Sequence, residues 1–185
     1  MAEFFPALDA KHEALLAAAP VYFVATAPKK GRINLSPKGM DTLRVISPTQ
    51  IAYLDLSGSG NETAAHLLDD GRITLMVCSF DRAAMILRLY GKGRSVQPAD
   101  AEWAALVARF PAIAGTRQII VVALDSVQTS CGYAVPVMDV VRERDTLRKY
   151  AAGLGEEVLL EKRARNLRSI DGLPTGLTNY REPQG

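Results

Sequence analysis

The sequence of 185 residues contains only two cysteines and two histidines. Cys78 and Cys131 lie far apart, and no zinc-type ligand spacing occurs, so neither a disulfide framework nor a metal site is expected. His12 and His66 lack a serine or cysteine and an acid at triad spacing, which gives hydrolytic catalysis no support. No apolar run approaches the roughly 18 residues of a membrane span, and the first residues, MAEFFPALDAKHE, are unlike a signal peptide. We therefore expect a cytoplasmic protein.

A surplus of charge of one sign is also missing. The chain has 22 Lys and Arg against 20 Asp and Glu, a net charge of +2, and nucleic-acid binding needs a concentrated basic face. Hydrophobic residues make up 48% and charged residues 23%, as in ordinary folded proteins. The length suits one domain with a sizeable core. No nucleic-acid or membrane partner is expected.

Short β-branched and aromatic runs predict most of the fold. We expect strands over residues 21–27, 32–36, 42–47, 51–56, 72–80, 85–97 and 117–131. Turn residues place the first four strands in two hairpins. Because strands follow one another without alternating helices, the pattern favours a mainly β protein, an antiparallel barrel of six or seven strands with peripheral helices.

Helices are expected only at the margins of this barrel. Asp9 is a cap for a helix over 11–19, Asn61 is the N-cap of a helix that stops at Gly71, and another helix begins at Pro98. Residues 136–168 look helical with a break at 153–155, and the tail is too rich in glycine and proline for regular structure. Residues 1–135 thus form the strand domain, and residues 136–185 a helical extension and tail packed on it.

The loop SGSGNET (57–63) joins a strand to a helix N-terminus. Its glycines match neither the dinucleotide fingerprint nor the P-loop. Free N–H groups and the helix dipole favour an anion there, with Ser59, Asn61 and Thr63 as added donors. An ordinary capped turn fits the same residues, and Glu62 favours it because its carboxylate can satisfy the dipole.

Other polar residues permit two interpretations each. Lys38, in INLSPKG, is either an anion ligand or a solvated turn residue. Arg88, between apolar neighbours, either needs a buried partner or lies on a half-exposed face. Cys131, in TSCGYAVP, is a reactive thiol or a small packed residue. The basic run EKRARNLR (161–168) is typical of a solvated helix face, with Glu161 and Arg165 at pairing distance.

Together these stretches resemble one known family. The order INLSPKG, AYLDL, SGSGNETAAHL, RITLMVCSF and LRLYGKGR is similar to the pyridoxamine 5′-phosphate oxidase-like flavoproteins, which are FMN-binding split β-barrels. The likeness covers residues 21–96 and continues more weakly through QTSCGYAVP and SIDGLPTGL. It is strongest to the largely uncharacterised branch that carries SPKG and GSGNETAAHL. The resemblance implies a homodimer with FMN in clefts at the subunit interface.

The resemblance also implies which residues contact the cofactor. The second strand and its turn map onto the flavin side, and the loop and helix start map onto the phosphate side. Later strands and the C-terminal segment of the partner close the site, which includes the 169–173 region. The implied cofactor-binding residues are Asn34, Leu35, Ser36, Pro37, Lys38, Ser59, Gly60, Asn61, Glu62, Thr63, Arg88, Cys131, Gly132 and Tyr133.

The chain departs from the founding oxidases in two places. Asn61, Glu62 and Thr63 stand where those enzymes place basic residues, and the C-terminal Arg-x-His element for vitamin B6 substrates is absent. The expected function is an FMN-dependent oxidoreductase acting on a small molecule other than pyridoxamine phosphate, with no catalytic residue assigned. A flavin-binding or stress-related binding module without turnover is the alternative, as is a related barrel that uses deazaflavin or haem.

Overall fold

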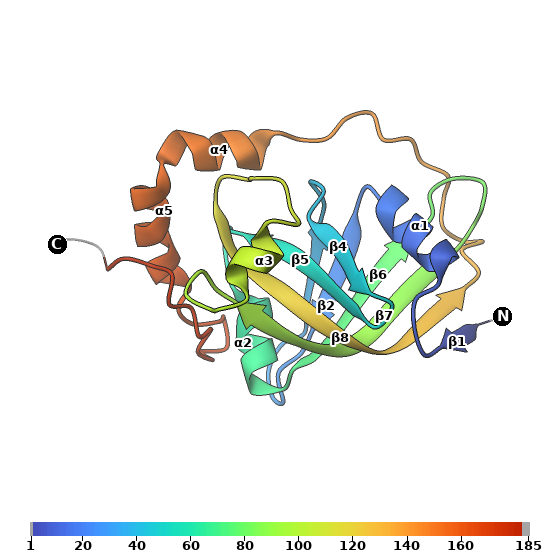
Figure 1. Cartoon of the computed structure of the whole chain (residues 1–185), viewed down its shortest axis with the longest axis horizontal. Helices are drawn as coiled ribbons and strands as arrows, with labels where there is room; N and C mark the ends of the chain where they lie inside the picture. The colour runs from blue at the N-terminus through green and yellow to red at the C-terminus, as the bar shows by residue number, and fades with distance from the viewer. Residues whose placement is uncertain (1, 183–185) are drawn as a thin grey trace.

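The computed structural model describes residues 2–182. Eight strands form one antiparallel sheet that curls into a barrel, with the helices outside it (Figure 1). The strands are β1 (Glu3–Phe5), β2 (Tyr22–Thr26), β3 (Asn34–Lys38), β4 (Leu43–Ser47), β5 (Gln50–Leu56), β6 (Arg72–Cys78), β7 (Ile86–Val96) and β8 (Thr116–Ser130). The helices are α1 (Ala10–Ala18), α2 (Glu62–Asp69), α3 (Trp103–Val107), α4 (Thr146–Leu154), α5 (Glu156–Arg163) and the 3₁₀ turn η1 (Ala164–Asn166).

The strand order is β3-β2-β6-β7-β8-β5-β4, so β3 and β4 are the two ends of the sheet. Both predicted hairpins form, β2 with β3 and β4 with β5. The Tyr22 hydroxyl hydrogen-bonds the Thr42 hydroxyl at 2.8 Å and joins β2 to the start of β4. The mainly β architecture with peripheral helices is confirmed.

The interior of the barrel holds the larger hydrophobic core. Inward-facing side chains from every long strand, among them Val24, Tyr53, Leu75, Leu89 and Ile120, are nearly inaccessible to solvent. A second cluster lies between α3 and the outer face of β5 and β8. These two cores fix the positions of β5 and β8, and the loop over residues 57–61 lies where β5 ends and β8 begins.

Gly91 allows the longest strand pair to close. The register of β7 against β8 shifts between Tyr90 and Gly91, and a Cβ atom at Gly91 would lie 2.1 Å from the Ala123 carbonyl oxygen. Only glycine permits this approach, and the bulge bends β7 along the barrel. The YGKG sequence is therefore a structural requirement of the curl.

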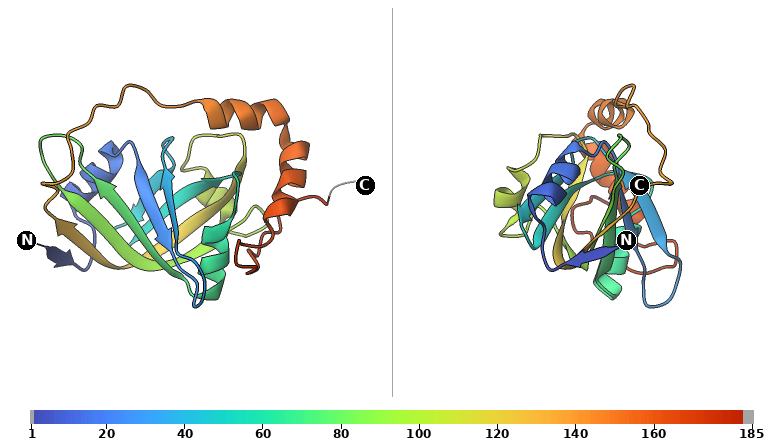
Figure 2. Two further views of the ribbon diagram at one scale, coloured as in Figure 1. Left: turned by 180° about the vertical axis from the view of Figure 1, so that it is seen from behind. Right: turned by 90° about the vertical axis from the view of Figure 1, so that its right-hand side faces the viewer.

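Three local expectations need correction. β1 was not predicted, and it pairs with the end of β8, which makes eight strands. The helix expected from Pro98 is shorter than predicted and forms only α3. The prediction of a helix over 136–168 was wrong for its first part, because residues 136–145 are irregular and α4 begins at Thr146. β-branched Val137, Val140 and Val141 disfavour helix there, and the segment crosses one side of the barrel without entering the sheet (Figure 2).

Other predicted signals are in place. Asp9 caps α1 by accepting hydrogen bonds from the N–H groups of Lys11 and His12, and Gly71 ends α2 with φ of 84°. Between Asn166 and residue 182 the structure shows an isolated bridge, Arg168 with Pro174, and no helix or longer strand. No helix within residues 2–182 has the length and apolar character needed to cross a membrane.

Candidate functional site

A cavity of about 460 Å³ opens where β3, the end of β5 and the start of α2 meet. Its walls come from segments that the sheet order brings together from distant parts of the sequence. The lining residues are Asn34, Ser36, Pro37, Lys38, Gly39, Met40, Thr42, Leu54, Asp55, Leu56, Gly58, Ser59, Gly60, Asn61, Glu62, Thr63, Arg117 and Leu147. The volume is in the range of small-molecule and cofactor sites.

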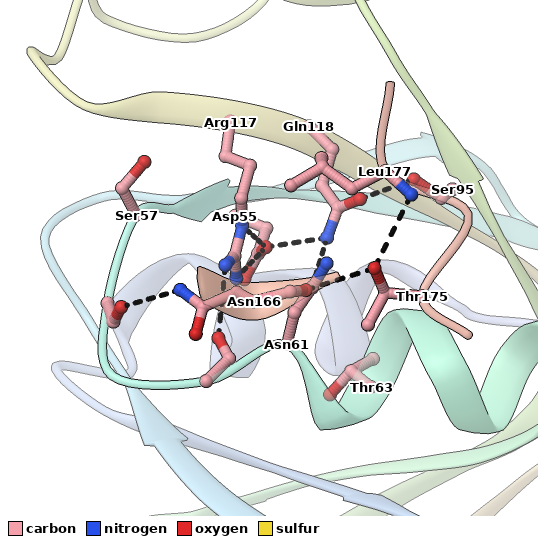
Figure 3. A network of polar contacts seen from close by, with 12 residues as sticks. Asp55, Ser57, Asn61, Thr63, Ser95, Arg117, Gln118, Asn166, Thr175 and Leu177 are labelled. Carbon is pink, nitrogen blue, oxygen red and sulfur yellow. Dashed lines mark hydrogen bonds and ion pairs between the residues drawn. The ribbon is translucent and has the colours of Figure 1, made fainter. Parts of the chain in front are cut away.

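A buried polar network forms the floor of this cavity (Figure 3). Asp55 Oδ2 accepts hydrogen bonds from Arg117 Nε at 3.0 Å and Nη2 at 2.7 Å, and from Gln118 Nε2 at 2.8 Å. Gln118 also donates to Asn61 Oδ1 at 2.8 Å. Lys38 Nζ lies 3.3 Å from the other Asp55 oxygen. The network therefore links β5, β8, β3 and the N-cap of α2.

Asp55 is the anionic centre of this network. Burial alone would raise the pKa of its carboxyl, but the charges of Arg117 and Lys38 and the hydrogen bonds from Gln118 and Arg117 outweigh burial and lower the pKa to about 2. Asp55 is thus ionised at neutral pH. Together with Lys38 and Arg117 it leaves one net positive charge at the cavity floor.

Two buried polar atoms beside the cavity have no hydrogen-bond partner within residues 2–182. They are Asn61 Nδ2 and the Tyr53 hydroxyl. Burial, followed by the charge of Asp55, raises the pKa of Tyr53 well above its usual value, so its hydroxyl is protonated. An unsatisfied buried donor costs free energy, and Asn61 lines the cavity. A ligand with acceptor oxygens would satisfy its amide, so the donor set fits a phosphorylated group.

The loop over residues 57–61 presents further donors. Arg117 Nη1 binds the Gly60 carbonyl oxygen at 3.0 Å. In the described part of the chain, the backbone N–H groups of Gly58, Ser59 and Gly60 donate to no protein acceptor. They lie at the N-terminus of α2, where the helix dipole favours an anion. Asn61 was expected to cap α2; it occupies the N-cap position, but its side chain bonds Gln118 instead.

The opposite wall comes from β3 and reaches the start of α2. Ser36 Oγ donates to Asn34 Oδ1 at 3.1 Å, and Asn34 Nδ2 donates to Thr63 Oγ1 at 3.3 Å. These hydroxyl and amide groups alternate with Leu35, whose side chain is 65% exposed on the other face of the edge strand. The wall therefore offers both donors and acceptors to a ligand.

Glu62 is held by the C-terminal tail. Both of its carboxylate oxygens accept the Ile170 N–H at 3.1 Å. Its negative charge nevertheless lines the cavity, and it cancels the surplus positive charge of the floor. An anion bound here thus depends mainly on neutral donors and on the α2 N-terminus.

The structure brings together nine of the fourteen residues that the family resemblance implies. Leu35, on β3, is exposed on the other face of that strand, and the remaining four residues lie elsewhere. Lining the cavity are Asn34, Ser36, Pro37, Lys38, Ser59, Gly60, Asn61, Glu62 and Thr63. Arg88 bonds Ser130 Oγ at 3.1 Å, and Cys131, Gly132 and Tyr133 follow the other end of β8. Within one chain these four residues are remote from Arg117, which lies at the start of β8.

Sequence reasoning missed Asp55, Arg117 and Gln118. Asp55 ends the apolar run of β5, and Arg117 and Gln118 precede the apolar run IIVVAL of β8. Polar residues at the ends of two evenly apolar strands are the signal that was available. Among residues 2–182, no group of three His, Cys, Asp or Glu side chains is arranged to hold a metal ion.

Fold and site together define an antiparallel split barrel with a donor-rich cavity at the edge of its sheet. A family model of pyridoxamine 5′-phosphate oxidase matches residues 8–131. Pyridoxamine 5′-phosphate oxidase family protein ustO of Aspergillus flavus is 38% identical over 176 residues, which cover 84% of this chain and 70% of that protein. The chain belongs to the pyridoxamine 5′-phosphate oxidase family.

Solved structures share the fold at low sequence identity. HupZ of Group A Streptococcus aligns with a TM-score of 0.52 and 17% identity, covering 65% of this chain and 91% of that one. A candidate pyridoxamine 5′-phosphate oxidase from Lactobacillus delbrueckii aligns with a TM-score of 0.51 and 15% identity over 66% of this chain and 94% of its own. These likenesses establish the split-barrel fold.

Proposed function

We propose that the cavity binds FMN and that the protein is an FMN-dependent oxidoreductase acting on a small molecule. The observation that carries the proposal is the Asn61 Nδ2 atom at the N-terminus of α2, which has no partner within residues 2–182 and lies in a cavity lined by Gly58, Ser59 and Gly60, whose backbone N–H groups donate to no acceptor in the same residues. Membership in the pyridoxamine 5′-phosphate oxidase family supports the choice of a flavin.

The lining residues divide by the chemistry they offer. Ser59, Thr63 and the N–H groups of the loop suit the phosphate, with Lys38 as the nearby cation. Asn34 and Ser36 on β3 suit the polar edge of the ring or the ribityl hydroxyls. FMN, when bound, supplies reversible hydride acceptance, and the chain supplies position and electrostatics. Asp55 and Arg117 stay paired, and their role is to hold the floor of the cavity.

The colour of the purified protein tests the cofactor. We expect a yellow protein with flavin absorbance that corresponds to about one FMN per chain, because the proposed site between β3, β5 and α2 is formed once in each chain. Added FMN should lose its fluorescence on binding to cofactor-free protein. A colourless preparation that does not change FMN fluorescence would contradict the proposal. An absorption spectrum of haem or deazaflavin would also contradict FMN and would identify the other cofactor.

Turnover needs a separate measurement. An oxidoreductase should accept electrons from NADH or NADPH into its bound flavin and pass them to an added acceptor. Flavin that binds tightly but resists both reductants and substrates would instead identify a flavin-binding module. Absorbance at the flavin band during anaerobic addition of each reductant distinguishes these two functions.

A homodimer is part of the proposal. Arg88, Cys131, Gly132 and Tyr133 are remote from the cavity of their own chain, and a second copy could bring them to it. Tyr133, Val137, Met138, Val140 and Val141 are each more than half exposed, an apolar surface of the kind that associates. Sedimentation at micromolar concentration should give twice the chain mass of 20.0 kDa. A monomer would contradict the shared site.

A further inference from the structure

Arg163 contradicts the solvated helix face expected for residues 161–168. Its side chain is fully inaccessible at the end of α5, whereas Arg165, two residues later, is exposed. Arg163 Nε donates to Ser57 Oγ at 2.9 Å, and Nη2 donates to the Thr116 carbonyl oxygen at 3.0 Å. The guanidinium thus joins the end of β5 to the start of β8, at the point where the loop over residues 57–61 begins.

Two buried arginines hold this loop from its two ends. Arg163 binds Ser57, and Arg117 binds the Gly60 carbonyl oxygen at 3.0 Å. Between them, Asn166 Nδ2 donates to the Gly58 carbonyl oxygen at 3.3 Å (Figure 3). The carbonyl oxygens of Gly58 and Gly60 therefore accept hydrogen bonds from side chains, while the N–H groups of the same turn have no acceptor within residues 2–182.

The electrostatic setting of Arg163 is costly. Burial lowers the pKa of its guanidinium, Glu156 raises it, and the like charge of Arg117 lowers it. Glu156 Oε1 lies 3.2 Å from Nη1, but this carboxylate is 62% exposed, and Nη1 makes no hydrogen bond of good geometry in the described chain. A buried, weakly compensated charge carries a desolvation cost, so the contacts of this guanidinium do not by themselves explain a gain in stability. Arg117 is already paired with Asp55 at 2.7 Å, so an anion on the far side of the loop would compensate chiefly Arg163.

We infer that Arg163 is a positioning residue that holds the loop over residues 57–61 in the form that receives a phosphate monoester, so that the protein selects phosphorylated over phosphate-free flavin. The inference rests on the proposed function for the identity of the ligand. Arg163 itself does not line the cavity between β3, β5 and α2, and it acts through Ser57 and the start of β8.

Comparison of FMN with riboflavin separates this role from general stabilisation. In Arg163→Gln the dissociation constant for FMN should rise about tenfold while that for riboflavin changes less than about threefold, because only FMN uses the loop N–H groups. Arg163→Lys keeps the charge but cannot reach both acceptors, so it should rescue FMN binding only in part. Arg165→Gln, an exposed change in the same basic run, is the matched control and should bind FMN like the wild type.

Ser57→Ala provides the same test while the buried guanidinium itself stays in place, in case Arg163→Gln does not fold. It removes the Nε acceptor, and it should weaken FMN binding with little effect on riboflavin. When Ser57→Ala is combined with Arg163→Lys, the two losses of FMN affinity should be less than additive, because both substitutions break the same contact between residues 57 and 163. Thermal unfolding of each variant confirms that a folded protein is compared.

Amide exchange in the flavin-free protein gives an independent measurement. The Ser57 N–H donates to the Gly115 carbonyl oxygen at 2.8 Å and should exchange faster in Arg163→Lys. The Ala83 N–H, in a distant turn closed by Asp81, should not change.

Four outcomes are decisive. Equal losses for both flavins, or unchanged FMN binding in folded Arg163→Gln and Ser57→Ala, would overturn the inference about Arg163 but not the proposal that the wild-type protein binds FMN. A wild-type protein that binds neither flavin would overturn the proposed function and the stated flavin preference with it. Unchanged exchange at Ser57 would then also remove Arg163 as the residue that holds the loop.

Discussion

Lys38 connects the cavity to the buried ion pair behind it. Its ammonium lies 3.3 Å from Asp55 and 5.4 Å from the centre of the Tyr53 ring, and its side chain is 21% exposed. Because Asp55 also accepts a hydrogen bond from the Arg117 guanidinium, Lys38 is not the only positive charge paired with that carboxylate. It can therefore turn toward a ligand without leaving Asp55 unpaired.

Removal of this ammonium should weaken FMN binding. For Lys38→Ala we expect the dissociation constant to rise about tenfold, or about 1.4 kcal/mol, as for one charge-assisted contact. Fluorescence titration with FMN measures it. Lys92→Ala is the control, since Lys92 is exposed and contacts Asp70 on another part of the surface. An unchanged constant would remove Lys38 from the phosphate site.

The residues that hold the cavity floor could not be predicted as a group from the sequence. Asp55 meets Gln118 because β5 and β8 pair in that register, across 63 positions of the chain. Nothing local to either residue indicates this pairing, which depends on the order of strands in the whole sheet. Asn61 illustrates the same limit, since its N-cap position was predictable, whereas the bond to Gln118 was not.

At the level of elements, the sequence predicted those features that depend on residues close together in the chain. The Asp9 cap, the Gly71 stop and the two hairpins form as expected because their turn residues act within a few positions. β1 was missed because its three residues become a strand only by pairing with Thr129, Gln128 and Val127. The loop over residues 57–61 lies between these cases, because its turn is local and its anchors, Arg117 and Arg163, are distant.

Glu62, at the start of α2, has opposite effects on the stability of the fold and on anion binding. Glu62 stabilises the helix N-terminus and holds the tail through the Ile170 N–H, yet it places a negative charge beside the anion site. Glu62→Gln keeps a hydrogen-bond acceptor and removes the charge. We expect the free energy of unfolding to fall by about 0.5 kcal/mol, the usual size of a helix-dipole interaction at a partly exposed site.

FMN affinity should change in the opposite direction. The dissociation constant of Glu62→Gln should fall about threefold, because a repulsive charge near the phosphate is lost. Urea unfolding and FMN titration of one preparation measure both effects. Glu161→Gln, on α5 and outside the cavity lining, is the control. Weaker FMN binding in Glu62→Gln would mean that the tail contact, rather than the charge, governs the site.

In the whole molecule, the C-terminal segment closes one end of the barrel. α4 and α5 lie outside the sheet, and the tail returns beside α2 (Figures 1 and 2). Arg163 contacts Ser57, Ile170 contacts Glu62, and Asn179 donates to the Arg117 carbonyl oxygen at 3.4 Å. The segment thus fastens the loop over residues 57–61 and both strands beside it.

The dependence of stability on pH follows from the same buried centre. The pKa of Asp55 is about 2 in the folded chain against an ordinary value of 3.8, so the unfolded chain binds the proton more readily. The carboxylate therefore stabilises the fold fully above pH 3.8, and this contribution disappears as the pH falls toward 2. The shift corresponds to about 2 kcal/mol of unfolding free energy.

Asp55→Asn isolates this contribution. At pH 7 the variant should lose about 3–5 kcal/mol, because Arg117 and Lys38 keep their charges without the buried carboxylate. Between pH 4 and 2 its stability should fall less steeply than that of the wild type, since the titrating group is gone. Urea unfolding at pH 7, 4, 3 and 2 measures both differences, with exposed Asp125→Asn as the control. Parallel pH profiles for wild type and variant would mean that Asp55 is not the group whose protonation weakens the fold in acid.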